Sequence, residues 1–124
     1  IFEQDDVMGE FSGLTGERTR RRNQTLSTYE VNTIRLDDLL NEYGAPDQID
    51  YLSIDTEGSE ISVLEGLLMT KRTILFVTIE HNFDSRRMKK YDEIFLASGY
   101  RKIYADVSIF DYWYVHKSID PSFL

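Results

Sequence analysis

The sequence predicts one α/β domain in which parallel strands are flanked by helices and an antiparallel hairpin ends the sheet. Its 124 residues suit a single domain. From residue 28 onward, β-branched and aromatic runs alternate with stretches that carry apolar residues at helical spacing. We therefore expect an irregular segment at residues 1–27, an α/β unit at 28–117 and a C-terminal tail at 118–124.

The N-terminal segment is expected to be mostly loop, because Gly9, Gly13 and Gly16 interrupt it. It also contains an arginine-rich run at residues 18–22. Such a run is either a solvated loop or a contact for an acidic partner or a phosphate. Both alternatives stay open.

The regular part of the chain begins with a strand and a short helix. Residues 28–36 alternate between apolar and polar side chains, which predicts a strand. Asp37 then stands where a helix cap is expected, before a helix over residues 38–43 that Gly44 and Pro46 end.

Two apolar runs in the middle of the chain predict the interior of the sheet. Residues 49–55 form a short run typical of a buried strand, and residues 73–80 are almost continuously apolar. Between them, residues 59–68 carry one apolar helical face, formed by Ile61, Leu64 and Leu68. Strands separated by a helix run parallel, so we expect 49–55 and 73–80 to be parallel neighbours.

The C-terminal third predicts one long helix and a hairpin. Ser85 is expected to cap a helix that runs to residue 98 and ends at Gly99. Residues 100–105 and 109–116 are two strands joined by a short link, which predicts an antiparallel hairpin at one edge of the sheet.

The composition excludes several classes of site and partner. A formal net charge of −8 argues against a nucleic-acid partner and against binding to an anionic membrane. Without cysteine the chain has no disulfide, no thiolate nucleophile and no cysteine zinc site. No apolar run reaches the length of a membrane span and no signal peptide opens the sequence, so we expect a cytoplasmic protein. The chain starts at Ile1 rather than Met, which suggests a fragment of a longer protein.

Acidic and polar side chains follow the two interior strands at the point where each strand ends. They are Asp55, Glu57 and Glu60 after the first strand, and Glu80, His81 and Asn82 at the end of the second. Ligands of open α/β sheets bind outside the carboxyl ends of the strands. We therefore expect the carboxylates of Asp55 and Glu80 to face one crevice.

These side chains suit acid–base chemistry, acceptor orientation or a hard metal ion. Asp55 and Glu57 are candidate catalytic residues, as is Glu80. Glu60 either binds substrate or offsets the dipole of the helix that it opens. His81 is either a base or a partner for loop backbone groups, and Asn82 is a lesser candidate for substrate binding.

The sequence resembles the FkbM-type methyltransferase family over roughly residues 28–116. The similarity rests on Leu36-Asp37-Asp38-Leu39-Leu40, on residues 49–60, on Val63-Leu64-Glu65-Gly66 and on Ile79-Glu80-His81-Asn82. Ser53 and Thr56 depart from the residues that the family often has there. The resemblance implies a Rossmann-like fold, S-adenosylmethionine as cofactor, and methyl transfer, most often to oxygen, of a small-molecule or glycan acceptor.

One part of the family pattern has no match in this sequence. The family holds its cofactor in an acidic, glycine-rich loop after the first strand, and the early glycines here lack that strand–loop–helix context. The chain would then be the second half of a class I methyltransferase sheet, with cofactor-binding residues unassigned and no metal ligand set assigned.

Two other classes of protein stay as alternatives. A half-sheet leaves a free strand edge, so the chain could be a non-catalytic fragment that forms a homodimer through that edge. Asp55 and Glu57 are also similar to the opening motif of DnaQ-like exonucleases, with His116 and Asp120 as downstream partners. That spacing is one residue short, and the negative charge disfavours a nucleic-acid substrate.

Overall fold

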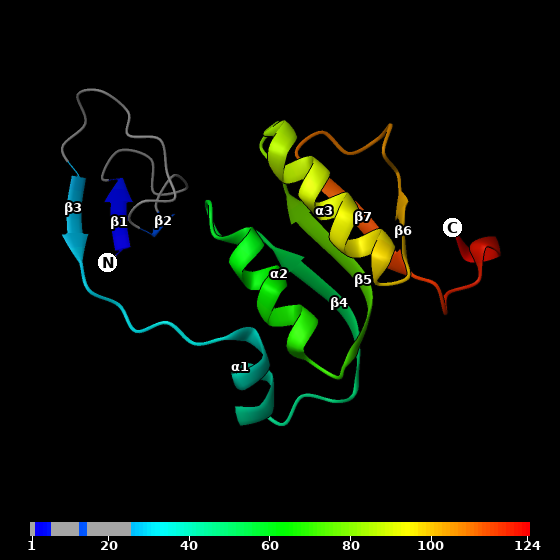
Figure 1. Ribbon diagram of the computed structural model, residues 1–124, viewed down its shortest axis with the longest axis horizontal. Coiled ribbons are helices and arrows are strands. Elements are labelled where there is room, and N and C mark those ends of the chain that lie inside the picture. Colours follow the sequence, from blue (N-terminus) through cyan, green and yellow to red (C-terminus); the bar gives the residue numbers. More distant parts are fainter. Residues whose placement is uncertain (1, 6–12, 15–25) are drawn as a thin grey trace.

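The computed structural model describes residues 2–5, 13–14 and 26–124, which form two sheets and three α-helices (Figure 1). The first sheet is antiparallel, in the order β2-β1-β3, and contains β1 (Phe2–Asp5), β2 (Gly13–Leu14) and β3 (Leu26–Tyr29). The second has four strands in the order β4-β5-β7-β6. The mixed α/β class predicted from the sequence is confirmed.

The four-stranded sheet combines one parallel and two antiparallel pairings. β4 (Gln48–Ile54) and β5 (Thr73–Glu80) are parallel neighbours, as predicted. β7 (Asp111–His116) runs antiparallel to β5 and to β6 (Tyr100–Ile103). The hairpin of β6 and β7 therefore lies at one edge, and β4 forms the other edge.

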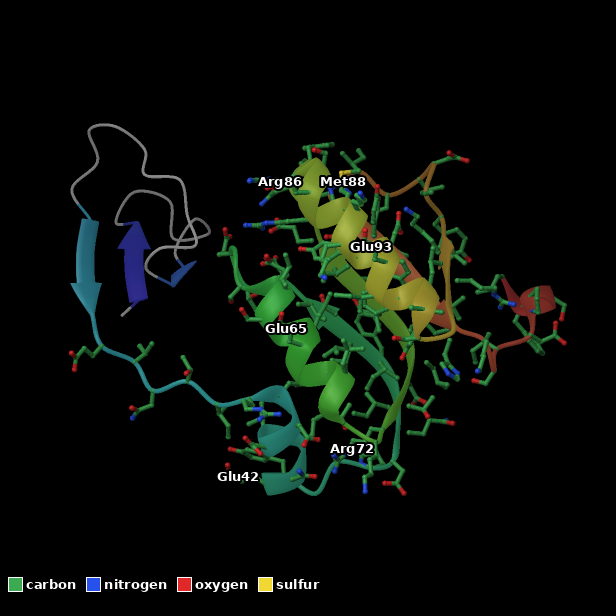
Figure 2. All side chains as sticks on the ribbon, in the orientation of Figure 1. Glu42, Glu65, Arg72, Arg86, Met88 and Glu93 are labelled. Carbon is green, nitrogen blue, oxygen red and sulfur yellow. The ribbon has the colours of Figure 1, made fainter. Side chains whose placement is uncertain are left out.

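Helices α2 (Glu60–Met69) and α3 (Ser85–Ala97) lie side by side over one face of this sheet (Figure 1). Their apolar faces and the strands form the core, where Leu64, Tyr91, Phe95 and Tyr114 are fully buried or nearly so. The rings of Phe95 and Tyr114 stack with centroids 4.1 Å apart. In Figure 2, Glu65 and Glu93 project from the outer sides of these helices.

Hydrogen bonds satisfy the hydroxyl groups of the tyrosines buried in this core. The hydroxyl of Tyr114 donates to Asp92 Oδ1 at 2.7 Å, and Lys102 Nζ donates to Asp92 Oδ2 at 2.6 Å. The hydroxyl of Tyr91 donates to the carbonyl of Glu80 at 3.1 Å. Burying an unpaired hydroxyl costs about 1–3 kcal/mol, and these hydrogen bonds avoid that cost for the buried tyrosines.

The short helix α1 (Leu36–Glu42) corrects two predictions. The strand expected at residues 28–36 is limited to its first two residues, because β3 ends at Tyr29 and residues 30–35 belong to no helix or strand. Asp37 lies inside the first turn of α1, where the N-cap is Arg35, so Asp37 is not the cap. Arg72 joins α1 to the start of β5 by donating to Asn41 Oδ1 and the Ala45 carbonyl (Figure 2).

The remaining predictions concern the start of α3 and the two ends of the chain. Asp84, not Ser85, caps α3: its side chain accepts from the backbone amides of Arg86 and Arg87. The segment expected to be mostly loop contains β1 and β2. The arginine-rich run at 18–22 lies outside the described residues. The tail carries one 3-10 turn, η2 (Pro121–Phe123). Among the described helices, none has the length and apolar composition needed to cross a membrane.

Candidate functional site

The carboxyl-terminal edge of the four-stranded sheet carries unusual backbone geometry. β4, β5 and β6 run in the same direction, so the loops that follow them meet at this edge. All four non-glycine residues with positive φ in the described part of the chain lie in these loops: Glu57 at 54°, Asn82 at 45°, Phe83 at 57° and Tyr104 at 53°. Each such residue costs roughly 1–3 kcal/mol, and such residues cluster at ligand sites.

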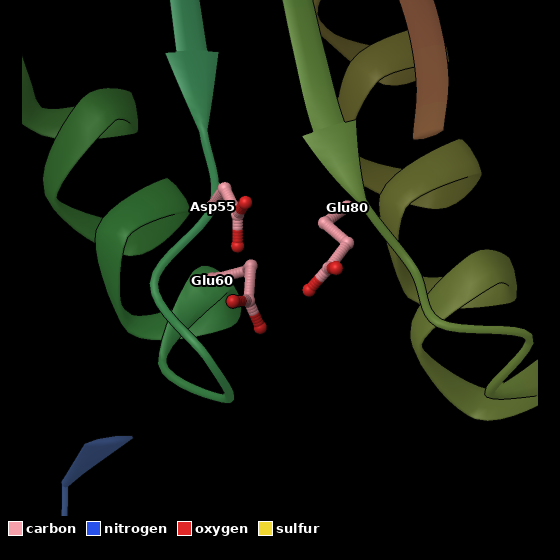
Figure 3. Close-up of side chains that lie close together, drawn as sticks. All are labelled: Asp55, Glu60 and Glu80. Atoms are coloured by element: carbon pink, nitrogen blue, oxygen red, sulfur yellow. The ribbon is translucent and has the colours of Figure 1, made fainter. Parts of the chain in front are cut away.

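Three carboxyl groups converge at this edge (Figure 3). Asp55, Glu60 and Glu80 each offer one oxygen, and these oxygens all lie within 4.8 Å of one another. Asp55 comes directly after β4, Glu60 opens α2 and Glu80 ends β5. The carboxylates of Asp55 and Glu80 therefore lie close together, as expected.

Glu60 holds the loop that surrounds it. Its side chain is fully buried. Oε1 accepts hydrogen bonds from the backbone amides of Thr56 and Gly58, both at 3.0 Å, and from the Thr56 hydroxyl at 3.2 Å. Oε2 accepts from Arg87 Nη1 at 2.9 Å. These four bonds engage both carboxylate oxygens and join the start of α2 to α3, so they give Glu60 a structural role.

Glu80 has the properties of a proton acceptor. Burial, together with the charges of Asp55, Glu57, Glu60 and Asp111, raises its pKa from 4.5 to about 7. Among the described residues, its Oε2 atom is buried and has no hydrogen-bond partner. A carboxyl group with a pKa near neutrality changes protonation state easily at physiological pH.

His81 satisfies loop backbone, one of its two predicted roles. The residue is 3% exposed, and Nδ1 accepts a hydrogen bond from the Phe83 amide at 3.0 Å. Burial lowers the pKa of the imidazole, which favours its neutral form. Its ring also lies 4.5 Å from that of Tyr112, between centroids. His81 thus supports the turn after β5, while Asn82 is exposed in that turn.

Sequence reasoning missed three residues of this edge. Asp111 pairs with Glu80 across β5 and β7, and its charge contributes to the raised pKa of Glu80. Arg87 neutralises Glu60 from a helix 27 residues away. Phe110 accepts a hydrogen bond from the His81 amide at 2.9 Å through its carbonyl. The sequence shows Asp111 near the start of the last predicted strand, but its position opposite Glu80 depends on the register between the strands.

Among the described residues, the carboxylates of Asp55, Glu60 and Glu80 are the candidate ligands for a metal ion. Hard cations such as Mg²⁺ and Ca²⁺ take six or more oxygen ligands. Asp55, Glu60 and Glu80 each offer one oxygen to such an ion, and Glu60 already accepts hydrogen bonds from two backbone amides and from Arg87. Water would have to complete such a site.

The exonuclease alternative lacks its expected geometry. His116 ends β7, at the opposite edge of the sheet from Asp111 and Glu80. Its neighbour Val115 pairs with Phe76, four residues before Glu80, which places it about 13 Å along the strand from the acidic edge. His116 Nδ1 instead lies 2.8 Å from the Ser118 hydroxyl.

Comparison with known proteins gives one match. Residues 4–102 match the family model described as Methyltransferase FkbM domain. The match begins earlier and ends earlier than the range of 28–116 expected from the sequence motifs, and it contains the acidic cluster of Asp55, Glu60 and Glu80. No curated protein and no solved structure gives a significant match to the chain.

Proposed function

The chain belongs to the FkbM methyltransferase family, and on that premise we propose that it forms the acceptor side of an S-adenosylmethionine-dependent O-methyltransferase. The observation that carries the proposal is Glu80, a carboxyl group with a pKa of about 7 beside Asp55 at the exit of two parallel strands. Methyl transfer to a hydroxyl needs a group that takes the hydroxyl proton as the new O–C bond forms.

The strand order supports a Rossmann-like origin for the sheet. β4 and β5 are parallel, and the reversed strand β7 lies between β5 and the edge strand β6. This arrangement agrees with the second half of a class I methyltransferase sheet. Ligands of such sheets bind at the carboxyl ends of the strands, where the acidic cluster lies.

In the proposed mechanism the chain positions the acceptor and removes its proton. The acceptor hydroxyl lies between Asp55 and Glu80. Asp55 accepts a hydrogen bond from the acceptor and fixes its orientation, which matters because an in-line displacement requires alignment of the reacting atoms. Glu80 takes the proton as the hydroxyl oxygen becomes the nucleophile. Glu57, in the strained turn after β4, is a second orienting group.

The described residues fit the acceptor better than the cofactor. S-adenosylmethionine supplies an electrophilic methyl group when it is bound. Its methionine part needs a glycine-rich loop between a strand and a helix, and the described residues of the four-stranded sheet contain no such loop. We therefore assign no cofactor-binding residue, and the roles above concern only proton transfer and orientation.

Matched substitutions in the full-length protein test the proposal. Asp55→Asn and Glu57→Gln preserve side-chain size and remove the charge. We expect methyl transfer from radiolabelled S-adenosylmethionine to fall by roughly 10²–10⁴ if the group is a positioned base or orients the acceptor. Asp50→Asn is the control, because Asp50 is an exposed carboxylate on β4. Normal turnover of folded Asp55→Asn and Glu57→Gln variants contradicts the assignment.

The free edge of β4 favours a second candidate function. β4 is the last strand of its sheet, and within the described residues its outer edge pairs with no other strand. Exposed edges of this kind pair readily with another chain. Association of two copies through β4 would give a dimer in sedimentation measurements at micromolar concentrations, and a monomer under those conditions argues against this candidate.

A further inference from the structure

Two exposed aromatic rings lie at the same edge of the sheet as the acidic cluster and take no part in the core. Phe83 is 62% exposed and Phe110 is 53% exposed. Their centroids are 5.4 Å apart with an interplanar angle of 67°. Large apolar side chains exposed together at a site are typical of surfaces that bind a ligand or partner. Phe83 and Phe110 are called the aromatic rim below.

Backbone contacts and strained geometry hold the aromatic rim in place. Phe83 has φ of 57°, which bulky side chains rarely adopt. Its amide donates to His81 Nδ1 at 3.0 Å, and the His81 amide donates to the Phe110 carbonyl at 2.9 Å. The His81 ring also meets the Phe83 ring edge-on at 5.7 Å. The buried histidine therefore ties both members of the rim to the end of β5.

The rim is within reach of a ligand that contacts Glu80. Phe83 follows Glu80 by three residues, at most about 11 Å of extended chain. Phe110 precedes Asp111, the residue that pairs with Glu80 across the two strands, so its Cα lies within about 10 Å of that of Glu80. A molecule with one ring and a short side chain spans this separation.

The charges near Glu80 select against anions. Burial and the charges of four carboxyl groups raise the pKa of Glu80, and the field of those charges opposes a negative charge on a ligand bound there. The cations described near this edge are paired with carboxylates: Arg86 with Asp84, Arg87 with Glu60, and Lys102 with Asp92. The aromatic rim adds a flat apolar surface, which attracts apolar rings and tolerates cations on its π-face.

We propose that the methyl acceptor carries a flat apolar group next to its hydroxyl and no negative charge, and that Phe83 and Phe110 bind this group while Asp55 and Glu80 face the hydroxyl. The inference rests on the proposed function for the identity of the ligand as acceptor. The juxtaposition of an aromatic rim and an acidic cluster makes the rim the specificity-determining surface of the site.

Three near-isosteric probes separate the charge and apolar requirements. Tyrosol is neutral, tyramine is cationic and para-hydroxyphenylacetate is anionic, and all three share one phenol ring. We expect ligand-detected NMR on the 124-residue chain to show tyrosol and tyramine binding at least tenfold more tightly than para-hydroxyphenylacetate. Phe83→Ala and Phe110→Ala should each weaken tyrosol binding by about threefold to tenfold, the contribution of one aromatic contact.

Two further variants make the result interpretable. Phe83→Trp keeps a flat ring and should retain tyrosol binding, which distinguishes lost contact from lost folding. Phe123→Ala removes an exposed ring in η2 and should leave binding unchanged. Absence of tyrosol binding, equal binding of the anion, or unchanged binding in both rim variants overturns the inference. A different result would contradict the proposed function alone. In that case the three probes bind as expected, but the full-length protein transfers no methyl group from S-adenosylmethionine to a hydroxyl acceptor.

Discussion

Replacing Glu80 with glutamine should stabilise the protein at alkaline pH while it abolishes most of the activity. The pKa of Glu80 rises from an ordinary 4.5 to about 7 in the folded protein. At about 1.36 kcal/mol per pKa unit, the cost of holding this carboxylate ionised is at most about 3.4 kcal/mol. Asp55 is exposed and solvent screens part of the repulsion, so we expect about 1–2 kcal/mol.

The direction of the pH dependence follows from the raised pKa. Below about pH 4.5 Glu80 is protonated in both the folded and the unfolded state, and the substitution changes little. Between about 4.5 and 7 the folded state keeps a proton that the unfolded state loses, so the wild type loses stability as the pH rises. Glutamine carries no charge, so Glu80→Gln avoids this loss and its advantage is complete above about pH 7.

Thermal unfolding at pH 5 and pH 8 measures the effect. For a domain of this size, the expected gain at pH 8 corresponds to a Tm increase of about 3–10 °C. Methyl transfer should fall by roughly 10²–10⁴ in the same variant, because the proton acceptor is gone. Glu65→Gln is the control, since Glu65 is exposed on the outer side of α2. Two results refute the reasoning: a Tm of Glu80→Gln below that of the wild type at pH 8, or a Tm difference between the two proteins that is the same at pH 5 and pH 8.

Two pairs of adjacent residues give further stability predictions. Arg87→Met leaves the buried Glu60 carboxylate without its cation and should cost about 2–4 kcal/mol in urea unfolding, whereas Arg86→Met, at a side chain that is 91% exposed, should stay within about 0.5 kcal/mol. Equal losses in the two variants would show that the buried pair has no special weight. Asp84→Ala should lower stability by about 0.5–2 kcal/mol through loss of the α3 cap, and Ser85→Ala should not. A larger loss of stability in Ser85→Ala than in Asp84→Ala would show that Ser85 caps α3.

The interior strands could be predicted from the sequence because their signals are local and strong. The run at 73–80 matches β5 in full, and the run at 49–55 is displaced from β4 by one residue. The strand expected at 28–36 failed for a physical reason. Alternation shows that a segment suits a strand, but a strand also needs a partner. The pairing of β3 with β1 ends at Tyr29, and residues 30–36 pair with no other described strand. Val31 and Ile34 are instead exposed.

The convergence of Asp55 and Glu80 was predictable for a topological reason. Parallel neighbours end at the same edge, so a carboxylate after each strand had to meet the other. The opposition of Asp111 and Glu80 depends on the register between β5 and β7, which the sequence does not specify. The outward position of Phe83 depends on a left-handed turn that no phenylalanine signals, and the role of Glu60 depends on a distant arginine.

The left-handed residues at one edge of the sheet also bear on how the protein moves. Local unfolding needs less free energy where the native backbone is already strained, so the loops after β4, β5 and β6 should open far more often than the strands that carry them. Amide hydrogens in β5 would then exchange with solvent slowly, and those in the turn around Asn82 rapidly. A molecule can enter between loops that fluctuate in this way while the sheet beneath them stays closed.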